Sequence, residues 1–373
     1  MRRSPPRRRT SPWVDPDRRR RLLLALPKTD LHVHLDGSLR PESLLEMGRE
    51  QGLRLPIRDA GALDAFLEGL TSGVSLPEYL KAFDLTLRVL QTKEALVRAA
   101  FELAEDSHRE NVRYLEVRYC PALHTKRGLT MGETVEAVNQ GLKRARRRYG
   151  IESGIIICGI RHMSPRLTNR LAEVAVAYAR QGVVAFDLAG AERDFPAKAH
   201  SRAFRLVAKN NLNVTVHAGE AYGPESIAQA LHYCSAHRIG HGTRLGENRE
   251  ILDYVNDHRI PLEMCLTSNV QTGAVPRASA HPFLRYLRRG LRVTLNTDNR
   301  LVSRTTMTQE LDRAVTTFHL TPNDVRHVLV NGFKSAFLPV ARKAALLRAS
   351  LREMDALFRH AGVLPPERGP EVL

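Results

Sequence analysis

The chain has 373 residues, of which 43% are hydrophobic, and a formal net charge of +17. This length allows one large domain or two modest ones, and the hydrophobic fraction is sufficient for a buried core. No apolar run approaches the roughly 20 residues of a membrane span. The early apolar run from Leu22 to Leu26 is too short for the core of a signal peptide. We therefore expect a soluble, cytoplasmic protein with no membrane partner.

The cysteines argue against a disulfide framework and against a thiolate zinc site. Cys120, Cys158, Cys234 and Cys265 are scattered along the chain, and no two of them form a Cys-x-x-Cys pair. This usage is typical of reduced, buried thiols in a cytosolic protein.

Much of the positive charge lies at the start of the chain. Residues 1–21 hold nine arginines and two aspartates, mixed with Pro and Ser and without a period. We predict a disordered Arg/Pro-rich tail over 1–21, a single domain over 22–363 and a flexible C-terminus over 364–373. The positive charge also allows an alternative function, that of a basic protein that binds nucleic acid. Elsewhere, however, Arg is spread over predicted helix faces such as residues 143–148, so we expect no nucleic-acid partner.

From residue 29 onward, short apolar segments alternate with longer amphipathic ones. Buried parallel strands are rich in Val, Ile and Leu and exclude internal Pro. Eight segments are predicted as strands, namely Thr29–Leu35, Val112–Tyr119, Ser153–Ile160, Val183–Gly190, Asn213–Ala218, Arg238–Gly242, Pro261–Thr267 and Arg292–Asp298.

Helical patterns separate these strands, as in Gly132–Arg148, Thr168–Gln181 and the last helix, Ala341–His360. Eight strands that alternate with helices favour an α/β fold of the (β/α)8 TIM-barrel type. The first connection, residues 36–111, is long enough for several extra helices, and another follows at the C-terminus. A doubly wound open sheet is the alternative, but no Gly-x-Gly-x-x-Gly follows a strand.

Polar side chains lie at the carboxyl ends of several predicted strands, which meet at one mouth in a barrel. His32 and His34 are two residues apart and share one face of the first strand. Three His and one Asp make a donor set suited to Zn²⁺, and Glu220 and His241 remain as acid/base groups. The four candidate ligands are His32, His34, His217 and Asp298.

These motifs resemble the adenosine deaminase family, within the metal-dependent amidohydrolase barrels. The resemblance covers roughly residues 28–355. It depends most on VHAGE at 216–220, RIGHG at 238–242 and LNTD at 295–298, with TDLHVHLDGS at 29–38. It implies a hydrolase that converts adenosine and deoxyadenosine to inosine and ammonia in purine salvage, with a purine nucleoside as its small-molecule partner.

The resemblance also implies a role for each candidate residue. One zinc per chain would be held by the four ligands above. Glu220 is similar to the proton donor to purine N1, and His241 to the residue that orients and activates the zinc-bound water. Asp36 and His34 would contact the ribose, and Gly190 would contact purine N3 through its backbone. Ser75–Phe83 is similar to the family's apolar gate helix.

The chain departs from the family pattern at Asn299, because two consecutive aspartates are common after the last strand. We expect Asn299 to donate to purine N7 through its amide. The exact substrate stays open, with adenine, aminodeoxyfutalosine and AMP as alternatives, although no Gly-rich phosphate cradle is present for AMP. The signature of cytidine deaminases is absent. The strand at 183–190 lacks the Lys that usually bridges two metals, which favours one zinc. A catalytically inactive barrel that binds nucleic acid is the remaining alternative.

Overall fold

A computed structural model describes residue 13 and residues 15–57, 59–71 and 74–363. Within them, eight parallel strands follow one another in chain order around one sheet. The strands are β1 Lys28–His34, β2 Val112–Tyr119, β3 Glu152–Ile160, β4 Val183–Ala189, β5 Asn213–Ala218, β6 Arg238–His241, β7 Leu262–Met264 and β8 Val293–Leu295. Val33 pairs in parallel with Asp298, just beyond β8, and this bridge closes the ring. The predicted (β/α)8 barrel is confirmed.

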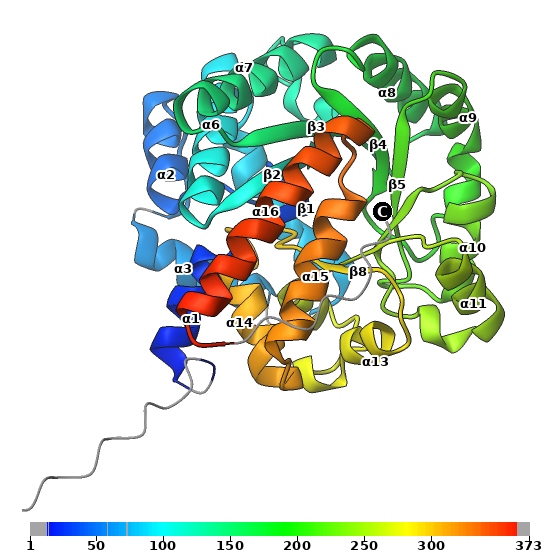
Figure 1. Ribbon diagram of the computed structural model, residues 1–373. Helices are drawn as coiled ribbons and strands as arrows, with labels where there is room; N and C mark the ends of the chain where they lie inside the picture. Colours follow the sequence, from blue (N-terminus) through cyan, green and yellow to red (C-terminus); the bar gives the residue numbers. More distant parts are fainter. Residues whose placement is uncertain (1–12, 14, 58, 72–73, 364–373) are drawn as a thin grey trace, which may run out of the picture.

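Helices surround the ring of strands (Figure 1). They are α1 Pro16–Ala25, α2 Pro41–Glu50, α3 Ala60–Thr71, α4 Leu76–Tyr79, α5 Phe83–Val89, α6 Lys93–Arg109, α7 Met131–Tyr149, α8 Pro165–Ala177, α9 Ser201–Lys209, α10 Pro224–His232, α11 Arg249–Asp257, α12 Leu266–Gln271, α13 Phe283–Arg288, α14 Met307–Phe318, α15 Pro322–Ser335 and α16 Val340–His360. Short 3₁₀ helices lie at Leu80–Ala82, Pro121–His124, Ala197–His200, Leu245–Glu247 and Ala278–Ala280.

The extra helices predicted after the first strand and at the C-terminus are present as α2 to α5 and α16. Figure 1 shows α16 lying across the end of the barrel that faces the viewer. Arg113, near the start of β2, pairs with Glu353 on α16 at 2.8 Å. Because this end holds the amino ends of the strands, their carboxyl ends lie at the opposite end of the barrel.

The helix boundaries follow from local sequence signals, as α7 illustrates. Thr130 and Glu133 form a capping box at its start, and Gly150 ends it with a φ of 75°. Gly141 lets α7 approach α6, because a Cβ at this position would lie 2.4 Å from the carbonyl oxygen of Val97. The two helices therefore pack closely against each other.

Two strands are shorter than the sequence predicted. The segment Pro261–Thr267 is a strand only over Leu262–Met264, because the chain turns at Cys265 and enters α12. The segment Arg292–Asp298 is a strand only over Val293–Leu295, and Asp298 has a φ of 60°, which does not occur in a regular strand. Both strands therefore end before the residues that reach the mouth of the barrel.

The predicted disorder of residues 1–21 needs a correction, because α1 begins at Pro16. Asp15 caps this helix, and the buried Arg19 side chain pairs with Asp312 on α14 at 2.7 Å. Residues 1–12, 14 and 364–373 lie outside the described residues, so the disorder of the first residues, the flexible C-terminus and the single domain stay predictions. Among the described helices, none has the length and apolar character to cross a membrane.

Candidate active site

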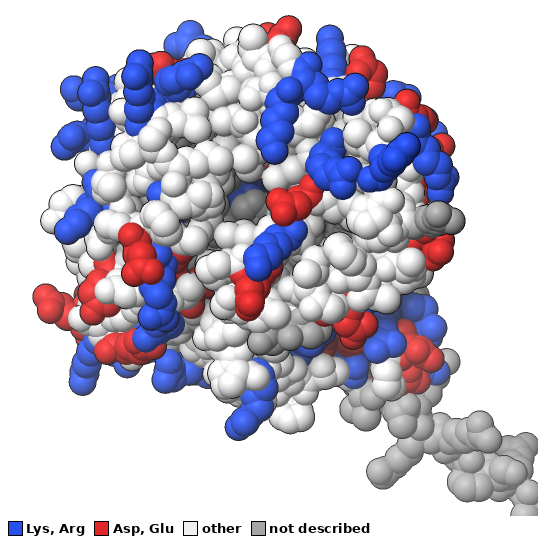
Figure 2. All heavy atoms as spheres, turned by 180° about the vertical axis from the view of Figure 1, so that it is seen from behind, with Lys and Arg blue, Asp and Glu red and all other residues white. Residues whose placement is uncertain are grey.

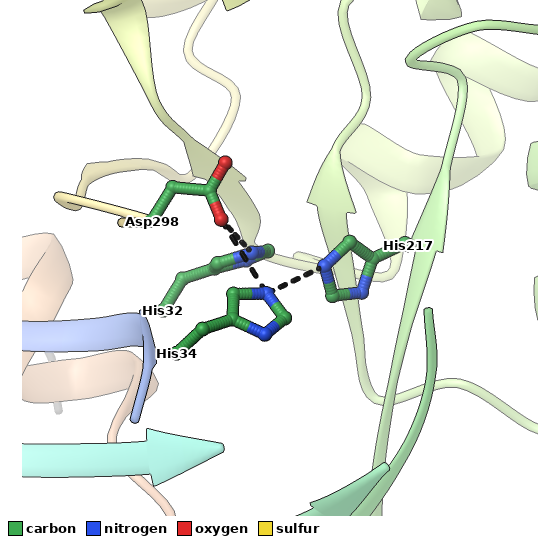
Figure 3. A group of neighbouring side chains, drawn as sticks. All are labelled: His32, His34, His217 and Asp298. Atoms are coloured by element: carbon green, nitrogen blue, oxygen red, sulfur yellow. Dashed lines mark hydrogen bonds and ion pairs between the residues drawn. The ribbon is translucent and has the colours of Figure 1, made fainter. Parts of the chain in front are cut away.

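Four side chains from three strand ends converge at the open mouth of the barrel (Figure 3). His32 and His34 come from β1, His217 comes from β5, and Asp298 follows β8. The Nε2 atoms of His34 and His217 are 3.2 Å apart. Asp298 Oδ1 lies 3.5 Å from His32 Nε2 and 3.4 Å from His34 Nε2. One donor atom from each residue falls within 4.8 Å of the others, so the structure brings together the four residues selected from the sequence.

The donor atoms of this group fit a metal ion. His32 Nδ1 lies 2.8 Å from a Glu263 oxygen, and His217 Nδ1 lies 3.0 Å from an Asp187 oxygen. A carboxylate on Nδ1 fixes the tautomer that leaves the Nε2 lone pair free for a metal. His32 Nε2 is buried and has no hydrogen-bond partner among the described residues. Three imidazoles and one carboxylate are ligands that suit a borderline divalent cation such as Zn²⁺.

A buried arginine holds the two supporting carboxylates in place. Arg118 donates to Asp187 at 2.9 Å and to Glu263 at 2.8 Å, and all three side chains are fully buried. Burial alone would raise the pKa of both carboxyls. His217 and Arg118 nevertheless lower the pKa of Asp187, and Arg118 and Arg238 hold that of Glu263 well below its ordinary value. Both groups therefore stay ionised and accept hydrogen bonds from the histidines.

Glu220 and His241 lie beside the four-residue cluster. Thr272 Oγ1 donates to Glu220 Oε1 at 3.0 Å, and Glu220 Oε2 lies 3.6 Å from His241 Nε2. Burial raises the pKa of Glu220, which favours its protonated form. His241 and Asp298 both have a positive φ, 62° and 60°, a strained conformation that clusters at functional sites. The structure therefore places a candidate proton donor next to the candidate metal ligands.

A cavity of about 410 Å³ opens above this cluster, which is within the usual size of small-molecule sites. Figure 2 shows a hollow near the centre of this face, with acidic and basic side chains close to its rim. Asp36, Gly190 and Asn299 line the cavity, as the sequence predicted. Burial raises the pKa of Asp36 to about 7. The predicted gate helix forms α4, the following 3₁₀ helix and the start of α5, and its apolar side chains cover the cavity, namely Leu76, Tyr79, Leu80 and Phe83.

Asn299 connects this gate segment to the end of β8. Its Nδ2 atom donates to the Tyr79 hydroxyl at 3.1 Å, and that hydroxyl lies 2.7 Å from Ser303 Oγ. Asn299 Oδ1 is buried and has no hydrogen-bond partner among the described residues. The amide is therefore held from one side only and has one further N–H to offer.

Comparison with known proteins decides the family of this chain. The family model described as adenosine deaminase matches residues 27–351. The chain belongs to the adenosine deaminase family. Adenosine deaminase 1 of Streptomyces coelicolor is 42% identical over 89% of this chain and 87% of its own length. A probable adenosine deaminase of Dictyostelium discoideum is 38% identical over 91% of this chain, which spans 44% of that longer protein.

Solved structures of related deaminases share the fold. An adenine deaminase from Arthrobacter aurescens superposes with a TM-score of 0.83 at 26% identity, over 88% of this chain and 99% of that one. The Arabidopsis protein ADAL in complex with IMP gives a TM-score of 0.81 at 26% identity, over 90% and 98% of the two chains. The names of these relatives mention different compounds, adenine in one case and IMP in the other. Membership of the adenosine deaminase family alone therefore does not fix the substrate of this chain.

Sequence reasoning missed a carboxylate that supports this deaminase site. Glu192 is buried two residues after Gly190, and it accepts the backbone N–H groups of residues 219 to 222 at 2.6 to 3.0 Å. It thereby holds the loop that carries Glu220. The available signal was its place in the loop after β4, at the end of the barrel where the polar residues collect.

Proposed function

We propose that this protein hydrolytically deaminates adenosine and deoxyadenosine to inosine and ammonia, with one zinc ion per chain. The observation that carries the proposal is a buried Glu220 beside four convergent metal-ligand side chains. A general acid and a metal site next to each other suit the replacement of an aromatic amino group by water. Family membership and the relatives named adenosine deaminase support the same activity.

The metal would be held by the four converging donors, His32, His34, His217 and Asp298. When bound, zinc supplies water with a pKa lowered to about 7, which provides a nucleophile at neutral pH. The Glu263 and Asp187 carboxylates keep His32 and His217 in the ligating tautomer.

Glu220 supplies the proton that the purine ring needs. As C6 becomes tetrahedral, N1 accepts negative charge, and a protonated Glu220 donates to it. Thr272 donates a hydrogen bond to Glu220 Oε1, so Oε2 is the oxygen that carries this proton. His241, whose Nε2 lies 3.6 Å from Glu220 Oε2, orients the attacking oxygen. In this arrangement the backbone of Gly190 contacts purine N3, and the side-chain amide of Asn299 donates to N7.

The remaining cavity suits a nucleoside better than a free base or a nucleotide. Asp36 and His34 line the cavity together with the apolar gate segment, and we assign these two residues to the ribose. Lys81 is the one lysine or arginine among the described lining residues, and Asp84 also lines the cavity. A phosphate dianion would therefore lack the cluster of cations that usually binds it.

A substrate panel tests this proposal directly. The full-length protein would be incubated with adenosine, deoxyadenosine, adenine, aminodeoxyfutalosine and AMP, and the absorbance change on loss of the 6-amino group would be followed. We expect the highest kcat/KM for adenosine and deoxyadenosine. A higher kcat/KM for any of the other three compounds would replace the proposed substrate. Salt-sensitive binding to DNA or RNA without any deamination would favour the nucleic-acid alternative instead.

The proposed compartment is the cytoplasm. The four cysteines are buried and form no disulfide with one another, which is typical of proteins in a reducing environment.

A further inference from the structure

A line of hydrogen bonds runs from His241 away from the cavity, through two residues that the proposed mechanism does not use. Asn269 Nδ2, on α12, lies 3.0 Å from His241 Nδ1. Asn269 Oδ1 lies 3.1 Å from Nε2 of His281, just before α13. His281 Nδ1 in turn lies 3.1 Å from the backbone nitrogen of Phe283. All four residues are buried, so water does not compete for these contacts.

The direction of each bond follows from the far end of the line. A backbone N–H only donates, so His281 Nδ1 must accept from Phe283. A neutral imidazole carries one proton, and the proton of His281 is therefore on Nε2, where it donates to Asn269 Oδ1. Burial lowers the pKa of His281 to about 3, which is consistent with a neutral ring.

The amide of Asn269 consequently has a single acceptable orientation. If the amide were turned over, its NH2 group would face the N–H of His281, and two donors would meet. With its oxygen toward His281, the NH2 group points to His241 Nδ1, which must accept. The proton of a neutral His241 is then on Nε2.

We infer that Asn269 and His281 are positioning residues that hold the His241 proton on Nε2, facing the cavity. This inference rests on the proposed function and deepens it. His241 Nε2 lies 3.6 Å from Glu220 Oε2 and next to the metal-ligand cluster. A neutral His241 of this tautomer presents a hydrogen-bond donor to the attacking oxygen. Of the two parts that the family resemblance implies for His241, the structure assigns the orienting one.

Asn269→Asp tests the inference with a change that preserves shape. A carboxylate only accepts, so it would draw the His241 proton to Nδ1 and leave Nε2 without it. Loss of an outer partner that orients a metal-ligating histidine typically lowers activity by about 10–100-fold, and we use the same scale for His241 beside the metal site. We expect kcat for adenosine to fall in that range, with KM within about threefold and an unchanged metal content.

A pair of variants at position 281 separates the tautomer from packing. Both His281→Gln and His281→Leu remove the ring nitrogen that accepts from Phe283, so they share that structural cost. Only Gln can still donate to Asn269 Oδ1. We expect His281→Gln to retain at least tenfold more kcat than His281→Leu. Asn331→Asp, which makes the same isosteric change at another buried amide that donates to a carbonyl, should keep kcat within about threefold.

The tautomer itself can be read from the ring nitrogens of ¹⁵N-histidine-labelled full-length protein, with His241→Ala to assign the signals. We expect a protonated Nε2 in the wild type and its loss in Asn269→Asp. A protonated Nδ1 in the wild type, or equal kcat for the Gln and Leu variants, would overturn the inference. If the wild type deaminates none of the panel compounds, the proposed function fails, but the ring spectrum still decides the tautomer.

Discussion

The carboxylate of Glu192 accepts the backbone N–H of Glu220 at 3.0 Å, so one buried acid orients the loop that carries another. The same carboxylate also accepts from Gly219, Ala221 and Tyr222. Four amide donors therefore depend on a single side chain. A buried donor that loses its partner costs about 1–3 kcal/mol, so the shape of this loop depends on Glu192.

Glu192→Gln should lower both stability and turnover. The Gln amide has one accepting oxygen, and its NH2 group would meet backbone N–H groups that also donate. We expect kcat for adenosine to fall by about tenfold, within the range for loss of an orienting partner. We also expect the free energy of unfolding to fall by about 1–3 kcal/mol. Steady-state kinetics and thermal unfolding measure the two effects, and Glu250→Gln, at an exposed position, is the matched control. Unchanged values of both would show that the loop does not need Glu192.

Glu220→Gln should retain the metal and lose most of its activity. Gln has the shape of Glu but carries no acidic proton for purine N1. General acid catalysis of this kind contributes about 10²–10⁴-fold, and we expect a loss of kcat in that range. Kinetics and elemental analysis of the same preparation provide the test, with the exposed Glu225→Gln as control. Activity within a few-fold of wild type would remove Glu220 from the role of proton donor.

The wild-type protein should contain one zinc ion per chain, and His217→Ala should lose both metal and activity. The reason is that His217 supplies one of the four converging donors. Elemental analysis after dialysis against a chelator-free buffer measures the metal content. The exposed His232→Ala should keep both properties. Active wild-type protein with no metal, or with two ions per chain, would contradict the single-zinc site.

Asn299→Ala should weaken the use of adenosine more than the use of 7-deazaadenosine. Asn299 Nδ2 uses one hydrogen for Tyr79, and the other is available for purine N7, which the deaza analogue lacks. We expect kcat/KM for adenosine to fall by the equivalent of about 1–3 kcal/mol. If the wild type and the variant lose activity equally on changing from adenosine to the analogue, Asn299 does not contact N7.

Deletion of residues 1–20 should lower stability and leave the site intact. The deletion removes the hydrogen bond from Trp13 to the Leu320 carbonyl and the ion pairs of Arg19 and Arg20 with Asp312. We expect the free energy of unfolding to fall by about 1–3 kcal/mol, with kcat unchanged, because α1 is not part of the cavity lining. Thermal unfolding and kinetics of the truncated protein test this. A lower kcat in a fully folded truncated protein would show that α1 contributes to the site.

The sequence predicted best those features that depend on local pattern. The barrel and the convergence of His32, His217 and Asp298 could be predicted because strand ends of a parallel barrel meet at one mouth. The ends of β7 and β8 could not, because they depend on distant segments. Asp298 pairs with Val33 of β1, and Thr267, just after the turn at Cys265, donates its backbone N–H to Glu310 on α14. Asn269 and His281 also escaped sequence reasoning, since their function depends on which way a hydrogen bond points. Neither a periodicity nor a motif in the sequence indicates which atom of a hydrogen-bonded pair is the donor.

The left-handed backbone at His241 and Asp298 affects how the thermal stability of this protein can be raised. Each such residue costs of the order of 1–3 kcal/mol, and glycine would adopt the same conformation without that cost. At these two positions the requirements of folding and of chemistry are therefore opposed. Glycine at either position would relieve the backbone strain but would remove a side chain that the site uses, so variants selected for stability need to be screened for turnover as well.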